Sequence, residues 1–440
     1  MKKHIIALSL LSVLSVTTVS CDRFLDITPT GKAIPKTLED YRAVLTRAYS
    51  LYPAHRAVIQ SRTDEVVMNT ESSTAVSYKD IFLWNDSSSD PATMETPYGQ
   101  FYSTIFYANH TIVEGAKDMP EGNEKNQILG EAYALRALCN FELVNLFAPE
   151  YSSANASQPA IPIVTEVDLE KTYPRATVQE VYNQILADVE QAENLINISN
   201  FDTGINYRFG TVALAAFKAR IYQYMGDWDN ALLYANNILT VKSELEDFNQ
   251  FNVLPSSFKS VEAIMNLDNN LNSNTNLAYR ASTSLINLYD QTNDLRFERY
   301  FRVSGSLYQS TKFASSNEFK TTFRVGEIYL LKAEAEYYLN QISASKSTLL
   351  QLASKRYNAV GLADFESKIS ALSGTDYLTE LYNERMRETS FEGLRWYDLR
   401  RTTKPEITHV YDTETATLQQ NDSRYTLRFP ASARLKNPNL

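Results

Sequence analysis

The chain has 440 residues, enough for one large domain or two to three ordinary domains with a sizeable core. Its net charge of −10 argues against nucleic acid and polyanionic glycans as ligands. Only 13 glycines are present, which argues against glycine-rich loops that bind dinucleotides or phosphates and agrees with long helices.

The N-terminus has the pattern of an export signal. The basic residues Lys2 to His4 precede an apolar run from Ile5 to Val16, which is too short to cross a membrane as a helix. Small and hydroxyl residues then lead to Cys21, at the position of a lipoprotein acceptor cysteine. We predict a signal peptide over residues 1–20 and a mature chain, residues 21–440, that is anchored to a membrane by lipid on Cys21.

The next part of the chain is predicted to be mainly helical. Thr37 and Asp40 form a capping box ahead of apolar residues at helical spacing. The same spacing predicts further helices over residues 98–114, 125–147 and 177–196. Residues 61–97, rich in Ser, Thr, Asp and Asn, are expected to form loops and short elements, and residues 156–174 an extended linker.

Two segments carry a repeat that resembles a tetratricopeptide hairpin. In residues 210–240, small alanines allow two helices to lie close together and Gly226 suits the turn between them. Residues 325–356 have the pattern of a second copy. With the neighbouring helices, about four hairpins can be drawn over approximately residues 125–240 and 325–400, enough to bury a continuous core. Generic helical pairs without superhelical stacking are the alternative.

Residues 241–324 interrupt the helical pattern. This stretch is rich in Asn, Ser, Thr and Tyr, with short runs of alternating polar and apolar residues. We predict loops with small strands, inserted between the helical repeats.

The highest density of charge lies between Glu384 and Arg401, where opposite charges repeatedly stand three residues apart. Glu388 and Glu392 have the spacing of a carboxylate pair, which is the acid and base arrangement of a glycosidase. Basic residues surround both, however, and would hold them ionised. We therefore favour a structural clamp of arginine–carboxylate pairs over a catalytic site.

The same stretch resembles a known family signature. From Glu384 to Arg400 it reads Glu-Arg-x-Arg-Glu-x-x-Phe-Glu-Gly-x-Arg-Trp-x-Asp-Leu-Arg, which is similar to the signature of the SusD/RagB family of Bacteroidota outer-membrane lipoproteins. Residues 130–137, the Phe24-Leu25-Asp26 start and the C-terminal tail also resemble family members, so the resemblance spans Cys21 to Leu440.

The resemblance implies a single domain over residues 21–440 that is mainly α. Tetratricopeptide-like hairpins would form a right-handed superhelical scaffold, with a loop-rich insertion carrying small strands. It further implies a cell-surface lipoprotein of the outer membrane that hands oligosaccharides, or in some members peptides, to a SusC-like TonB-dependent transporter.

No motif for catalysis, metal or cofactor is visible. The four histidines are scattered, and the run from Asp86 to Asp90 lacks the spacing of an EF-hand. Cys139 lies in an apolar run without a disulfide partner and is expected to be a buried, inert thiol. We predict no enzyme activity, no metal and no cofactor, and prefer a binding protein.

Neutral sugars are bound by aromatic faces flanked by polar side chains. The ligand-facing segments are expected to be the irregular ones, residues 61–97 and 241–324. The candidate ligand residues are Trp84, Asn85, Asp86, Tyr98, Tyr279 and Tyr289. For each aromatic residue, packing in the core is the alternative, and Trp228 and Trp396 are predicted to pack.

Three classes of function stay open. The first is an oligosaccharide-binding partner of an outer-membrane transporter, which we favour. The second is a peptide-binding partner of such a transporter, which the few tryptophans and the Tyr- and Asn-rich insertion fit nearly as well. The third is a structural or adhesive lipoprotein built on helical repeats. The sequence indicates the class of protein better than its cargo.

Overall fold

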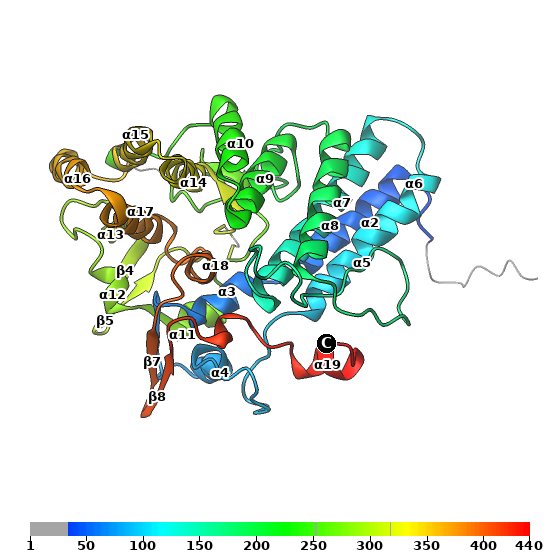
Figure 1. Cartoon of the computed structure of the whole chain (residues 1–440), viewed down its shortest axis with the longest axis horizontal. Helices are drawn as coiled ribbons and strands as arrows, with labels where there is room; N and C mark the ends of the chain where they lie inside the picture. The colour runs from blue at the N-terminus through cyan, green and yellow to red at the C-terminus, as the bar shows by residue number, and fades with distance from the viewer. Residues whose placement is uncertain (1–33, 251–252, 317) are drawn as a thin grey trace, which may run out of the picture. The chain divides into compact units, whose positions relative to one another are not determined.

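The computed structural model describes residues 34–250, 253–316 and 318–440 (Figure 1). The predicted signal peptide and Cys21 therefore lie outside the described residues. Residues Thr37–Leu440 form one compact unit, and the fold described below is that of this unit. In the described part of the chain, no helix is both long and apolar enough to cross a membrane.

Four long helices form the N-terminal part of the unit. They are α2 (Leu38–Leu51), α5 (Gly99–Val113), α7 (Asn123–Phe147) and α8 (Val178–Leu195), and Figure 1 shows them side by side. The capping box predicted at the start of α2 is present, since the Thr37 hydroxyl accepts from the Asp40 N–H and the Asp40 carboxylate accepts from the Thr37 N–H. Helix α7 is buried on nearly every side, and its Cys139 is a buried free thiol as predicted.

The predicted helical hairpins follow. Besides α7 with α8, they are α9 (Thr211–Met225) with α10 (Trp228–Val241) and α14 (Val325–Tyr338) with α15 (Ile342–Ala353). Helix α16 (Ala359–Ala371), which was not predicted, precedes α17 (Gly374–Thr389), and α17 packs on α14. Gly226 takes the left-handed conformation (φ 73°) that the turn between α9 and α10 requires. Helix α10 packs on α14, so successive hairpins share a core. The mainly α fold is confirmed, whereas the handedness of the superhelix stays a prediction.

Small strands occupy the irregular segments 61–97 and 241–324, as predicted, and one further pair lies nearer the C-terminus. A four-stranded antiparallel sheet has the order β1 (Val66–Met68), β3 (Tyr279–Ala281), β5 (Leu307–Ser310) and β4 (Phe301–Ser304). Two-stranded pairs are formed by β2 (Ala263–Met265) with β6 (Phe323–Arg324) and by β7 (Ile407–Tyr411) with β8 (Glu414–Leu418). The shorter helices include α3 (His55–Ile59), α4 (Lys79–Phe82), α6 (Gly115–Asp118), α11 (Ser273–Ala278), α12 (Thr283–Ile286), α13 (Arg296–Tyr300), α18 (Arg395–Arg401) and α19 (Ala431–Lys436).

The charged stretch near the C-terminus is a structural clamp. Glu388 on α17 pairs with Arg324 (2.7 Å) and Arg356 (2.8 Å), and Glu392 pairs with Arg324 (2.8 Å) and Lys312 (2.7 Å). Burial alone would raise the pKa of Glu392, but Arg324 and Lys312 outweigh burial and lower it. Both carboxylates are closed off from solvent. The acid and base alternative is therefore wrong for this pair, and the clamp is confirmed.

Gly326 of α14 leaves room for the charged side chains of the clamp. A Cβ added at Gly326 would lie 2.8 Å from Glu388 Oε1 and 2.9 Å from Glu262 Oε2, and closer still to Arg324 Nη1. We expect Gly326→Ala to lower the free energy of unfolding by roughly 1–3 kcal/mol, the cost of overpacking a core, as measured by urea denaturation. Gly99→Ala on α5 is the matched control, because nothing lies within 4 Å of its added Cβ. Equal stability of the two variants would contradict the prediction.

Candidate ligand-binding pocket

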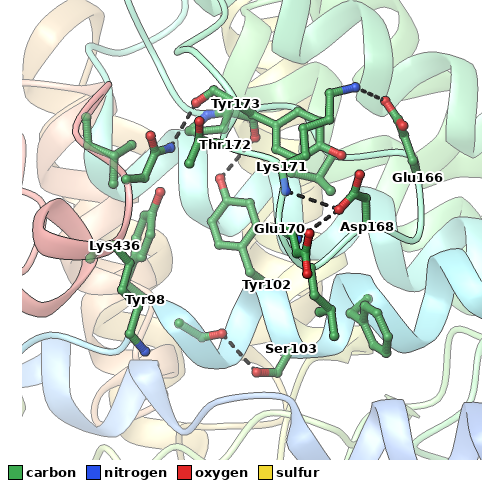
Figure 2. Close-up of a pocket in the computed structure, with 18 of the residues that line it drawn as sticks. Tyr98, Tyr102, Ser103, Glu166, Asp168, Glu170, Lys171, Thr172, Tyr173 and Lys436 are labelled. Atoms are coloured by element: carbon green, nitrogen blue, oxygen red, sulfur yellow. Dashed lines mark hydrogen bonds and ion pairs between the residues drawn. The ribbon is translucent and has the colours of Figure 1, made fainter.

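A pocket of about 530 Å³ opens between α5, the segment from Pro162 to Tyr173 and the C-terminal helix α19 (Figure 2). Helix α5 presents Tyr102, Phe106 and Tyr107 to it from one face, because these residues recur at helical spacing. The volume is in the range of small-molecule sites, and the walls combine aromatic rings with polar side chains. We therefore treat this pocket as the candidate ligand-binding site of the described residues.

The aromatic wall is held in place by hydrogen bonding and ring packing. The Tyr102 hydroxyl donates to the Pro162 carbonyl (3.0 Å), which joins α5 to the opposite segment. Tyr98 packs against Tyr102 with ring centroids 5.1 Å apart, and against Phe147 and Phe429 behind it. Tyr98 lines the pocket although only 7% of it is exposed. The rings form a preorganised surface for a ligand.

Two carboxamides fix the ends of the segment opposite α5. The buried Asn109 side chain donates to the carbonyls of Val164 (3.0 Å) and Glu166 (3.2 Å), and it accepts from Arg136 (2.8 Å). At the other end, Asn437 donates to the Tyr173 carbonyl (2.8 Å). An irregular segment is thus held by side chains of α5 and of the C-terminal region.

Between these points the segment carries most of the pocket's charge. Asp168 Oδ1 accepts from the N–H groups of Glu170 (2.8 Å) and Lys171 (3.1 Å). The Lys171 ammonium pairs with Glu166 and lies 4.9 Å from the centre of the Tyr173 ring. Hydrogen bonding to Glu166 is the main cause that raises the pKa of Lys171. The segment therefore presents carboxylates beside an aromatic ring.

The Tyr173 hydroxyl is enclosed and has no hydrogen-bond partner in the described residues. Burial, followed by the nearby Glu166 carboxylate, raises the pKa of Tyr173, so the hydroxyl stays protonated and able to donate. The exposed carboxylates of Asp168 and Glu170 offer acceptors to a ligand rich in hydroxyls. Among residues 34–250, 253–316 and 318–440, no group of three or more His, Cys, Asp or Glu side chains is arranged to hold a metal ion.

The structure places the predicted ligand residue Trp84 in the core, which corrects the expectation of an exposed ring. Trp84 is 1% exposed, its ring stacks on His409 at 4.2 Å, and its Nε1–H donates to the Arg62 carbonyl (3.1 Å). Asp86 pairs with the Arg62 guanidinium (2.6 Å). Asn85 is exposed but donates to Asp80 (3.1 Å). These three residues hold a loop in place and lie outside the pocket.

Tyr279 and Tyr289 are also core residues, with 1% and 5% of their surface exposed. Their hydroxyls donate to the carbonyls of Ala57 (3.1 Å) and Arg387 (2.6 Å), so neither ring face is open to a ligand in this structure. Of the predicted ligand residues, Tyr98 lines the pocket. Tyr102 and Tyr173 were missed, although the aromatic residue and three carboxylates between Pro162 and Pro174 are a signal for a binding loop.

Comparison with known proteins gives a consistent picture along the chain. A family model described as "Starch-binding associating with outer membrane" matches residues 23–223, and a model of the SusD family matches residues 266–435. The SusD-like protein P38 of Formosa agariphila is 29% identical over 225 residues, which cover 48% of this chain and 41% of the relative. The match thus spans less than half the length of that relative.

Solved structures share the fold over most of their length. A SusD superfamily protein from Bacteroides thetaiotaomicron superposes with a TM-score of 0.77 at 19% identity, covering 92% of this chain and 98% of that one. A laminarin-binding SusD-like protein has a TM-score of 0.62 at 19% identity, covering 84% and 92%. At such identities the similarity concerns the fold alone.

Proposed function

Since this chain belongs to the SusD/RagB family, we propose that it is a non-catalytic, nutrient-binding lipoprotein of the outer membrane that captures oligosaccharides. Anchoring through lipid on Cys21, display at the cell surface and delivery to a SusC-like TonB-dependent transporter are parts of the same proposal. They are supported by the leader sequence and by the description of the family as associated with the outer membrane.

The observation that carries the proposal is the pocket beside α5. Its partly exposed aromatic rings suit the apolar faces of pyranose rings, and the carboxylates of Asp168 and Glu170 suit pairs of sugar hydroxyls. A relative with the same fold is described as binding laminarin, which supports a glycan ligand. Peptide binding is the alternative that the following experiment also tests.

We expect Tyr173→Ala to weaken oligosaccharide binding about tenfold, because a stacking aromatic ring contributes roughly 1–1.5 kcal/mol. Isothermal titration calorimetry of the purified protein against neutral oligosaccharides and a peptide mixture measures the effect. Tyr173→Phe keeps the ring and isolates the hydroxyl. Tyr338→Ala removes an exposed tyrosine of α14, outside the pocket, and is expected to leave affinity unchanged.

Two results would count against the proposal. Saturable binding of peptides without any oligosaccharide would replace it by the peptide-binding function. Binding of an oligosaccharide that is unaffected by Tyr173→Ala would retain glycan capture but move the site away from this pocket.

A further inference from the structure

The charges of the pocket are divided between its walls. Asp168 and Glu170 lie on the segment opposite α5, and Lys436 of α19 lies across the pocket from them (Figure 2). The Lys171 ammonium is paired with Glu166. In the described residues, no ion pair reaches the carboxylate of Asp168 or Glu170. This wall therefore carries net negative charge, because the three carboxylates of Glu166, Asp168 and Glu170 stand against the one ammonium of Lys171.

One of these two carboxylates, that of Asp168, has a fixed position. Asp168 is held by two N–H groups of its own segment, and the segment is pinned at both ends by Asn109 and Asn437. Tyr173 lines the same pocket as Asp168 and Glu170, so a ligand in the pocket that contacts its ring lies near these carboxylates. Both side chains are exposed, and a carboxylate that a ligand brings close to them would be repelled at short range.

We propose that Asp168 and Glu170 make this pocket selective for uncharged oligosaccharides and reject sugars that carry carboxylate or sulfate groups. The inference rests on the proposed function and adds the residues that set its specificity. Selectivity of this kind arises from a built-in repulsion toward the wrong ligand as much as from attraction toward the right one.

The test compares one oligosaccharide in an uncharged form and in a negatively charged form. A neutral glucan oligosaccharide that binds is compared by calorimetry with the same oligosaccharide oxidised at C6 to its uronic acid form. With the wild-type protein the oxidised form is expected to bind at least roughly tenfold more weakly, the size of a repulsion between two charges near a protein surface. In about 1 M salt, where the screening length falls to about 3 Å, the difference should shrink.

The double variant Asp168→Asn/Glu170→Gln is expected to bind both forms within roughly twofold, because the repulsive charges are gone. Asparagine at position 168 keeps the side-chain oxygen that accepts the two N–H bonds. The control, Asp364→Asn/Glu366→Gln on the exposed face of α16, changes the net charge equally. This control variant should keep the full difference in affinity between the neutral and the oxidised oligosaccharide. The comparison separates a local effect of Asp168 and Glu170 from the effect of the overall charge of −10.

Three outcomes would overturn the inference. The first is equal affinity of the wild-type protein for both forms, which leaves the proposed function intact. The second is a preference for the neutral form that persists in the double variant. The third is tighter binding of the oxidised form that Lys436→Gln abolishes, which would make the opposite wall decisive. If no oligosaccharide bound at all, the proposed function would fail and the inference with it.

Discussion

Replacing Glu388 by glutamine is expected to lower the free energy of unfolding by about 3–5 kcal/mol, the cost of breaking a buried ion pair by removing one partner. Glu388 is fully buried and accepts hydrogen bonds from Arg296, Arg324 and Arg356. Burial alone would raise its pKa, but Arg356 and Arg324 outweigh burial and hold the pKa well below its ordinary value. The amide of glutamine would remove the one counter-charge that these three guanidinium groups share and turn N–H groups toward them.

Urea denaturation of the wild-type protein and of Glu388→Gln, followed by circular dichroism, measures the loss. Glu366→Gln, an exposed glutamate of α16, is the matched control and should unfold at the urea concentration of the wild-type protein. If Glu388→Gln also unfolded there, the cluster would not stabilise the fold. A second variant, Arg356→Met, removes a different partner of the same cluster and should show a loss of similar size.

The helical framework could be predicted because its determinants are local. The capping box of Thr37 and Asp40 and the turn at Gly226 each depend on residues within one or two helical turns. The sequence predicted that small strands occur, but not which strands pair with one another. Their pairing joins Val66–Met68 to Tyr279–Ala281, which stand far apart in the chain, and no local pattern specifies that register. The β7–β8 hairpin was not predicted at all.

The candidate site was harder to predict because it also depends on contacts between distant parts of the chain. Trp84 stands directly before the polar residues Asn85 and Asp86, which suggests exposure, yet its ring is buried against His409 of the C-terminal hairpin. Conversely, Tyr173 lies in what the sequence indicates as an extended linker. That linker becomes a pocket wall because Asn109 and Asn437, from distant parts of the chain, hold its backbone. Which aromatic rings stay open to a ligand is therefore a property of the tertiary contacts.

A second large effect is expected from a buried carboxyl group that titrates near neutral pH. Burial raises the pKa of Glu65 to about 8, although Arg395 opposes the shift. One carboxyl oxygen accepts from the Gln60 amide, and the other has no partner in the described residues. Because the native pKa lies above the ordinary value of 4.5, the native state holds a proton that the unfolded state releases. The free energy of unfolding should therefore fall as the pH rises from about 4.5 to about 8, by about 1.4 kcal/mol for each pH unit.

The variant Glu65→Gln removes this titration from both states, so its stability relative to the wild-type protein should grow by about 4 kcal/mol between about pH 5 and about pH 8. The difference in the free energy of unfolding between the two proteins at each pH cancels the contributions of groups that titrate in both. His409 is one of these: burial lowers its pKa to about 4, so its contribution to stability is lost as the pH falls from 6.5. Denaturation curves measured at each pH give the difference. A constant difference across this range would mean that Glu65 is ionised in the native state and that Arg395 outweighs its burial.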